Sequence, residues 1–157
     1  DTKERDRDQL VADGYRSQTG LLAVACEVVV QRAVRERVSM VLEGVHIDAN
    51  TVKRLQGTGE IIVVPIMLAI LKQDVLRKRI RGRGTTALQR RAQRYLKSFD
   101  AIWQLQSYLL SEADREQISI VVNDDRENTI VEILRIIGDT LSARLEPTLK
   151  RVFPTAG

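Results

Sequence analysis

The chain has 157 residues, 43% hydrophobic and 29% charged, a size and composition typical of one globular domain with a buried core. Its longest apolar run, residues 61–71, is too short for a membrane-spanning helix, and its single cysteine cannot form an internal disulfide. These features argue against a membrane protein and against a disulfide-stabilised secreted protein, and we expect a cytoplasmic protein.

The formal net charge of +4 is modest, but the basic residues are unevenly distributed. Between Lys72 and Lys97, ten basic residues stand against one acid, Asp74. Such an excess of positive charge predicts an anionic partner, which is a nucleotide, a sugar phosphate or a nucleic acid. Aromatic residues make up only 4% of the chain and no known nucleic-acid-binding motif is present, so nucleic acid is the least favoured partner.

Helical periodicity alternates with short apolar runs along the chain, which predicts a parallel α/β sheet with helices on both faces. In the first helix, apolar residues from Leu21 to Ala33 recur at three- and four-residue steps and give one apolar face. We expect one domain with a frayed N-terminus over residues 1–9 and a C-terminal tail over residues 146–157. The expected elements are helix 10–37, interrupted near Gly14 and Gly20, strand 39–44, a short helix ending at 56, strand 61–71, basic helix 74–83, long helix 87–116, strand 118–122 and a last helix ending near 145.

The run from Ser39 to His46 organises the sequence. It is apolar in its centre and ends in Glu43, Gly44, Val45 and the only histidine of the chain. An apolar run bounded in this way predicts a buried strand with polar side chains at its carboxyl end. Because ligands of open α/β sheets bind at that end of the strands, Glu43 and His46 are candidate site residues. The alternative is a buried strand followed by an ordinary turn.

Two motifs carry a resemblance to a known family. Residues 43–46, Glu-Gly-Val-His, match the E-G-V-H signature of the 2-phosphoglycerate kinase family of P-loop kinases. Residues 94–109, RYLKSFDAIWQLQSYL, resemble that family's R-Y-L-x-x-F-x-x-I-R-x-I-Q-D-Y-L helix. Residues 122–129 match a later V-x-N-x-x-x-x-x-T pattern loosely. The chain therefore resembles this family over most of its length.

The resemblance implies an incomplete P-loop kinase-like fold, a three-layer sandwich, as one partial domain over residues 1–157. It also implies ATP and Mg²⁺ as cofactors and a small phosphorylated hydroxy acid resembling 2-phosphoglycerate as substrate. The G-x-x-x-x-G-K-[ST] loop that would hold the nucleotide phosphates is absent from the chain. We therefore expect the carboxyl-terminal portion of such a kinase, inactive by itself, with a missing strand between strands 39–44 and 61–71.

The resemblance also implies roles for individual residues. Glu43 falls near the place of an acidic residue that holds Mg²⁺ through water or orients the acceptor hydroxyl; the alternative is a capping or salt-bridging glutamate. His46 is expected to contact a substrate phosphate or carboxylate, with a hydrogen-bonded loop histidine as the alternative. Arg94 is expected to contact a substrate phosphate. Asn123 is expected at the edge of the nucleotide base, or else it is a turn residue.

The basic helix resembles a kinase lid. Arg79 and Arg83 match the family's R-F-x-x-R pair, and their spacing of four puts them on one helical face. A mobile helix with two arginines can close over transferring phosphoryl groups, because guanidinium binds phosphate through two hydrogen bonds. We expect two or three of the ten basic residues to act in this way and others to form a solvated face.

Two positions of the second motif depart from the family. Trp103 stands where the family usually has arginine and Ser107 where it usually has aspartate, so both positions lose charge. The first interpretation is a portion of an ATP-dependent small-molecule kinase. The alternative is a non-catalytic regulatory module that binds an anion or a partner chain. Open strand edges also predict either a homo-oligomer or completion by a missing N-terminal portion.

Overall fold

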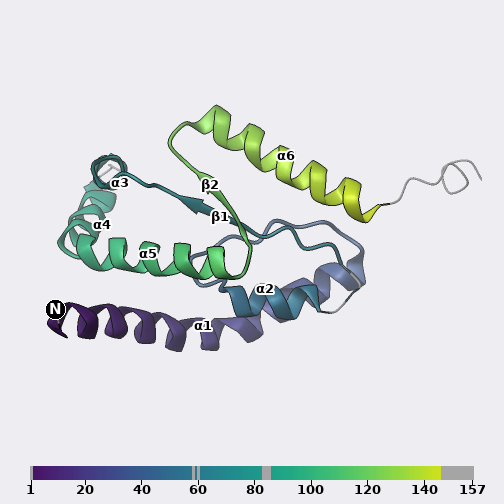
Figure 1. The fold of residues 1–157 in the computed structure, drawn as a ribbon, viewed down its shortest axis with the longest axis horizontal. Helices are drawn as coiled ribbons and strands as arrows, with labels where there is room; N and C mark the ends of the chain where they lie inside the picture. The colour runs from purple at the N-terminus through teal and green to yellow at the C-terminus, as the bar shows by residue number, and fades with distance from the viewer. Residues whose placement is uncertain (1, 58, 60, 83–85, 146–157) are drawn as a thin grey trace, which may run out of the picture.

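A computed structural model gives the fold of the chain and describes residues 2–57, 59, 61–82 and 86–145 (Figure 1). Arg83 and the expected tail over residues 146–157 lie outside the described residues. None of the described helices is long and apolar enough to cross a membrane. The elements are α1 (Thr2–Glu36), α2 (Ala49–Gln56), β1 (Ile66–Ala69), α3 (Gln73–Arg81), α4 (Thr86–Lys97), α5 (Phe99–Arg115), β2 (Ser119–Val122) and α6 (Arg126–Arg144).

The two strands form a parallel pair, with Ile66 opposite Ser119 and Ala69 opposite Val122. Parallel strands need a long crossover, and α3, α4 and α5 form it here. Both α5 and α6 contact β2, and they lie on opposite sides of the sheet (Figure 1). The expected α/β class with helices on both faces of a parallel sheet is therefore confirmed, although the described residues are mostly helical and the sheet is small.

The strand expected over residues 61–71 is shorter in the structure. Pairing begins at Ile66, directly after Pro65, because proline has no N–H to donate to a ladder. The strand expected over residues 118–122 is confirmed as β2 within one residue. The two apolar runs therefore predicted the positions of both strands, but the run over residues 61–71 overestimated the length of β1.

The strand expected over residues 39–44 is wrong. This segment is extended, but it pairs with no strand among the described residues. The side chain of Val41, in the middle of the apolar run, is 93% exposed. The run therefore has the composition of a buried strand without the neighbouring strand and the covering layer that would bury it.

The path of the chain explains why this segment is extended. After the end of α1 the chain runs back along the same helix, and at Val45 it reaches Tyr15. Helix residues 15–36 rise about 32 Å along the axis, and the extended residues 37–45 span about 30 Å. An extended conformation is therefore what the return path requires, whether or not a neighbouring strand is present.

The first helix, α1, differs from its expectation in two ways. It begins at Thr2, within the stretch expected to fray, and continues through Gly14 and Gly20 without the expected interruption. The expected apolar face is wrong, because Leu21 and Val24 are largely exposed. Packing of α1 against α5 and α2 offsets the helix cost of about 1 kcal/mol for each glycine. The buried side chains, of which only Ala33 belongs to the expected face, are mostly small: Ala12, Tyr15, Thr19, Ala23 and Ala33.

The long helix expected over residues 87–116 is divided at Ser98 into α4 and α5. Phe99 is only 2% exposed and forms a small core with Ile80 and Ala92. Residues on both sides of Ser98 therefore pack with Ile80 of α3 in one small core.

Large apolar side chains are exposed on several elements. On α6, Val131 and Leu134 are exposed by 66% and 62%, and Leu21 of α1 is exposed by 80%. Large apolar side chains that gather into one exposed patch are uncommon on a monomeric globular protein, whereas single exposed ones are normal. The expected homo-oligomer or missing N-terminal portion stays a prediction, because the structure holds one copy of this chain.

Gln106 of α5 fixes the end of β1. Its side-chain amide accepts a hydrogen bond from the Ile70 N–H at 3.1 Å and donates one to the Ile70 carbonyl oxygen at 2.9 Å. One residue earlier, the Ala69 carbonyl oxygen accepts from the Asn123 N–H at 2.8 Å and extends the β1–β2 ladder. The Gln106 amide thus satisfies the two backbone groups of Ile70 just after the strand.

We expect Gln106→Leu to lower the free energy of unfolding of the chain by about 1–3 kcal/mol, because it leaves two partly buried backbone groups without partners. Urea titration followed by circular dichroism measures the change. The matched control is Gln93→Leu, at an exposed position of α4, which should change stability by less than about 0.5 kcal/mol. Equal effects of the two substitutions would contradict the anchoring role.

Candidate functional site

Tyr15 of α1 holds the loop that contains Glu43 and His46. Its phenol donates a hydrogen bond to the Val45 carbonyl oxygen at 2.9 Å. Its ring stacks against the His46 imidazole, with ring centres 6.0 Å apart and planes inclined by 14°. Because Tyr15 is one of the buried side chains of α1 and is 5% exposed, its ring is a fixed support for this loop.

The second motif meets the first at the same tyrosine. Tyr108 of α5 packs edge-on against Tyr15, with ring centres 5.9 Å apart. The guanidinium carbon of Arg16 lies 5.4 Å from the Tyr108 ring centre, and Arg16 Nε donates a hydrogen bond to the Tyr108 hydroxyl at 3.2 Å. The two motifs that resemble one family, residues 43–46 and 94–109, therefore meet at Tyr15, which belongs to neither motif.

Glu43 is exposed, and within the described residues its carboxylate makes no hydrogen bond or ion pair. The capping or salt-bridging alternative is thus not seen in that part of the chain. The described residues also contain no cluster of three acidic, histidine or cysteine side chains for a metal ion. Mg²⁺ in kinases is often held by one or two carboxylates together with substrate phosphates, and an exposed, unpaired carboxylate fits such a role.

His46 is half-buried, and one of its ring nitrogens has a partner. Nε2 lies 2.8 Å from the Gln18 side-chain oxygen, Oε1. The turn that carries His46 is closed by a hydrogen bond of 3.2 Å from the Ile47 N–H to the Gly44 carbonyl oxygen. His46 therefore lies inside this tight turn and Glu43 directly precedes it, and no strand among the described residues comes before them.

A second group of predicted residues lies after the carboxyl ends of β1 and β2. Arg79 of α3 donates through Nη2 to the Asp124 carbonyl oxygen at 2.9 Å, so the basic helix rests on the loop after β2. Asn123, half-buried in that loop, uses its backbone N–H to extend the ladder to Ala69. The structure thus brings Arg79 next to the loop of Asn123 at the edge where ligands of parallel sheets bind.

The other basic residues of the arginine-rich segment have different environments. Arg77 lies over the Phe99 ring at 3.6 Å and 3.7 Å from the Asp100 carboxylate, so it packs against the small core. Arg94 is exposed on α4, and within the described part of the chain it makes no hydrogen bond or ion pair with another predicted site residue. Arg83 lies outside the described residues, so its pairing with Arg79 on one face stays a prediction.

The two departures from the family pattern have structural explanations. Trp103 stacks on Phe99, with ring centres 6.4 Å apart, and packs against the core of Phe99, Ile80 and Ala92. Ser107 donates to the Trp103 carbonyl oxygen within α5. Trp103 therefore contributes packing where the family usually has a positive charge.

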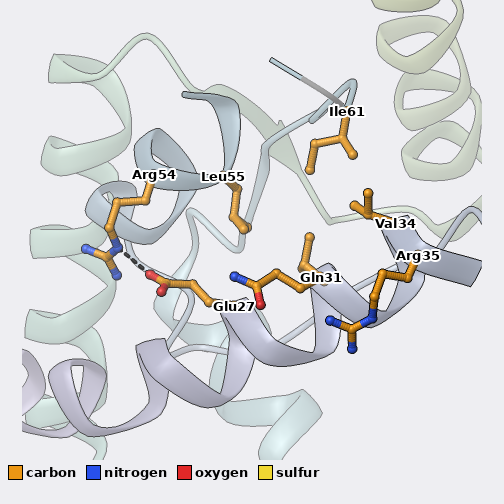
Figure 2. A pocket seen from close by; sticks show the side chains of 8 residues that line it. Glu27, Gln31, Val34, Arg35, Arg54, Leu55 and Ile61 are labelled. Atoms are coloured by element: carbon orange, nitrogen blue, oxygen red, sulfur yellow. Dashed lines mark hydrogen bonds and ion pairs between the residues drawn. The ribbon is translucent and has the colours of Figure 1, made fainter. Parts of the chain in front are cut away.

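Neither of two pockets beside α1 is lined by Glu43, Arg79 or Arg94. The smaller, about 170 Å³, lies beside Tyr15 and Tyr108. The larger, about 420 Å³, lies between α1 and α2 (Figure 2). Its Arg54 is paired with Glu27, which reduces its attraction for an anion (Figure 2). The lining residues of the larger pocket are Glu27, Val30, Gln31, Val34, Arg35, Arg54, Leu55 and Ile61.

Comparison with known proteins finds several relatives of one kind. The chain is 29% identical to the 2-phosphoglycerate kinase of Methanopyrus kandleri over 136 residues, covering 83% of this chain and 40% of that kinase. It is 28% identical to that of Pyrococcus horikoshii, covering 83% and 42%, and 30% identical to that of Thermococcus kodakarensis, covering 77% and 40%. The chain is similar to archaeal 2-phosphoglycerate kinases. No family model and no solved structure matches it.

The similarity to 2-phosphoglycerate kinases confirms the resemblance that the two motifs predict. The chain spans about two fifths of the length of these relatives, which agrees with the expected carboxyl-terminal portion. Sequence reasoning missed Tyr15 and Gln18, which support the E-G-V-H loop from α1. Their spacing of three on a helix would have placed them on one face, but nothing in the sequence pairs that face with residues 43–46.

Tyr15 gives a prediction for the stability of the chain at alkaline pH. Burial, and next the nearby charge of Asp48, raises the pKa of its phenol above the ordinary value. Above pH of about 10 the unfolded state therefore loses a proton that the folded state keeps. Since the folded state then binds more protons, the free energy of unfolding falls as pH rises.

We expect Tyr15→Phe to make the free energy of unfolding less dependent on pH above about 10, because the titrating phenol is gone. At pH 8 the same variant should be less stable by about 0.5–1.5 kcal/mol, since it lacks the hydrogen bond to Val45. Urea titrations at pH 8 to 11.5 measure both effects. Tyr95→Phe, at an exposed tyrosine of α4, should keep the wild-type profile, and an unchanged slope in Tyr15→Phe would contradict this account.

Proposed function

We propose that this chain is the acceptor-binding and lid portion of an ATP-dependent kinase that phosphorylates a small phosphorylated hydroxy acid resembling 2-phosphoglycerate. The observation that carries the proposal is the joining of the E-G-V-H loop to the second motif through Tyr15 and Tyr108. The names of the archaeal relatives support the reaction class. In this proposal the nucleotide-phosphate loop is supplied by residues outside these 157.

Each predicted residue has a role in the proposed reaction. Glu43 helps to hold Mg²⁺ or orients the acceptor hydroxyl, and His46 contacts the phosphate or carboxylate of the acceptor. Arg79 stabilises negative charge that develops during phosphoryl transfer, together with Arg83. Arg94 and Asn123 are the further candidates, for a substrate phosphate and for the nucleotide base. ATP supplies the transferred phosphoryl group when bound.

The alternative function, a non-catalytic module that binds an anion or a partner chain, is supported by one observation. Trp103 packs against the core at a position where the kinase family that the motif resembles usually has arginine. The arginine-rich segment would then bind an anion without transferring phosphate. The two functions differ in one measurable property, ATP-dependent phosphorylation of an acceptor.

The decisive experiment assays the protein encoded by the complete gene. We expect it to transfer phosphate from ATP to 2-phosphoglycerate in the presence of Mg²⁺, and to prefer this acceptor to 3-phosphoglycerate and glycerate. The 157-residue chain alone is the control and should show no transfer, because it lacks the phosphate-binding loop. A complete gene product that binds ATP but phosphorylates none of the three acceptors would favour the non-catalytic module.

Substitutions in that gene product test the roles of Glu43 and Arg79. Glu43→Gln keeps the size of the side chain but removes its charge, and Glu43→Asp moves the charge by about one methylene group. Each should lower turnover on the order of 10²-fold, as should Arg79→Ala. Melting temperature should hardly change for the Glu43 variants, because this side chain is exposed.

Two matched controls accompany these variants. Glu127→Gln changes an exposed glutamate of α6, and Arg81→Ala removes an exposed arginine from the same helix as Arg79. Both should keep turnover within about threefold of wild type, since a surface charge far from the transferred group adds little. If Glu43→Gln has normal turnover, the catalytic assignment of that residue is wrong. If Arg79→Ala and Arg81→Ala are equally mild, the basic helix is a solvated face.

A further inference from the structure

The single histidine of the chain is held from α1 by two residues one turn apart. Tyr15 stacks against one face of the His46 ring and binds the preceding carbonyl oxygen, of Val45. Gln18 places its Oε1 atom 2.8 Å from His46 Nε2. Stacking on Tyr15 restricts the tilt of the His46 ring, and the Gln18 amide restricts rotation of that ring within its plane. The orientation of the His46 side chain is therefore fixed by two residues of α1.

We propose that Tyr15 and Gln18 are positioning residues that hold neutral His46 as the Nε2–H tautomer and leave its Nδ1 atom free to take up a proton and then donate a hydrogen bond to an anionic ligand. An amide oxygen only accepts hydrogen bonds, so the ring nitrogen that faces it carries the proton. Among the described residues Nδ1 has no hydrogen-bond partner. The ligand half of this inference rests on the proposed function, in which His46 contacts the acceptor.

The position of His46 supports the ligand half. Nδ1 accepts a hydrogen bond when the ring is neutral and donates one when the ring is protonated, and a phosphate oxygen is bound by the donating form. Glu43 directly precedes the turn that the Ile47–Gly44 hydrogen bond closes, and His46 lies within it. This short segment thus contains a carboxylate for a cation or hydroxyl and an imidazole nitrogen for an anion. A phosphorylated hydroxy acid carries both kinds of group.

The tautomer can be measured without any enzyme activity. Nitrogen-15 spectra of the imidazole ring, recorded at a pH where the ring is neutral, distinguish the protonated from the unprotonated nitrogen. The 157-residue chain contains one histidine, so its ring signals are unambiguous. We expect wild type to show a single Nε2–H tautomer, and Gln18→Leu to show a mixture of both tautomers.

Two variants control this measurement. Gln18→Glu keeps an oxygen acceptor at the same place and should retain the Nε2–H tautomer. Gln31→Leu changes another exposed glutamine of α1 and should leave the histidine spectrum unchanged. A wild-type chain with an Nδ1–H tautomer, or a Gln18→Leu chain with an unchanged spectrum, would overturn the proposal.

Acceptor kinetics of the complete gene product test whether Gln18 acts through His46. We expect Gln18→Leu to raise the KM for 2-phosphoglycerate by about three- to tenfold with little change in kcat, because binding of the acceptor anion is weakened. His46→Ala should raise KM at least as much. In the His46→Ala background, Gln18→Leu should have no further effect, as a double-mutant cycle requires of a residue that acts through another.

The outcomes separate this inference from the proposed function. If His46→Ala raises KM and Gln18→Leu does not, the positioning role is wrong and the proposed function stands. If His46→Ala leaves KM unchanged, the assignment of His46 to the acceptor is wrong, and the ligand half of the inference is wrong with it. If the two substitutions raise KM additively, Gln18 acts independently of His46 and the positioning role is overturned.

Discussion

The contact between Tyr15 and residues 45–46 determines where the candidate site lies. The chain returns along α1 as an extended segment without a strand partner among the described residues, so backbone pairing does not fix its far end. The phenol–carbonyl hydrogen bond and the stacked rings supply that restraint. The buried position of Tyr15 matters here, because a hydrogen bond shielded from water is worth more than one on the surface. Glu43 and His46 are placed by this contact.

The sequence predicted the order of the helices and of the two paired strands, but not the start of α1, the length of β1 or the division of α4 from α5. Glu43 directly precedes the turn that contains His46, because the two residues are three apart in sequence, and their roles stay predictions. Arg79 reaches the loop of Asn123 because the carboxyl ends of adjacent parallel strands meet at one edge. The sequence could not assign Arg94 to either group, because the spacing of an exposed arginine on a helix does not indicate which residues lie beside it in the fold.

The failed expectations share one cause. Hydrophobic periodicity describes a single segment and does not identify the segment that packs or pairs with it. Residues 39–44 have the composition of a strand, but a strand also needs a neighbour with free N–H and carbonyl groups. The aliphatic face of α1 has regular spacing, yet mostly small residues, including Ala12 and Ala23, are buried instead. The break at Ser98 lies beside the small core of Ala92, Phe99 and Ile80, and Ile80 comes from α3, outside the segment that shows the helical periodicity.

The second motif has a structural role that depends on two uncharged residues, Gln106 and Tyr108. Gln106 and Tyr108 are two residues apart on α5 and so point about 200° apart around the helix. One binds the backbone after β1, just before the basic helix with Arg79, and the other packs on Tyr15 beside His46. The same helix therefore supports both groups of candidate residues. Gln106 and Tyr108 therefore connect both groups of candidate residues to one helix through uncharged side chains.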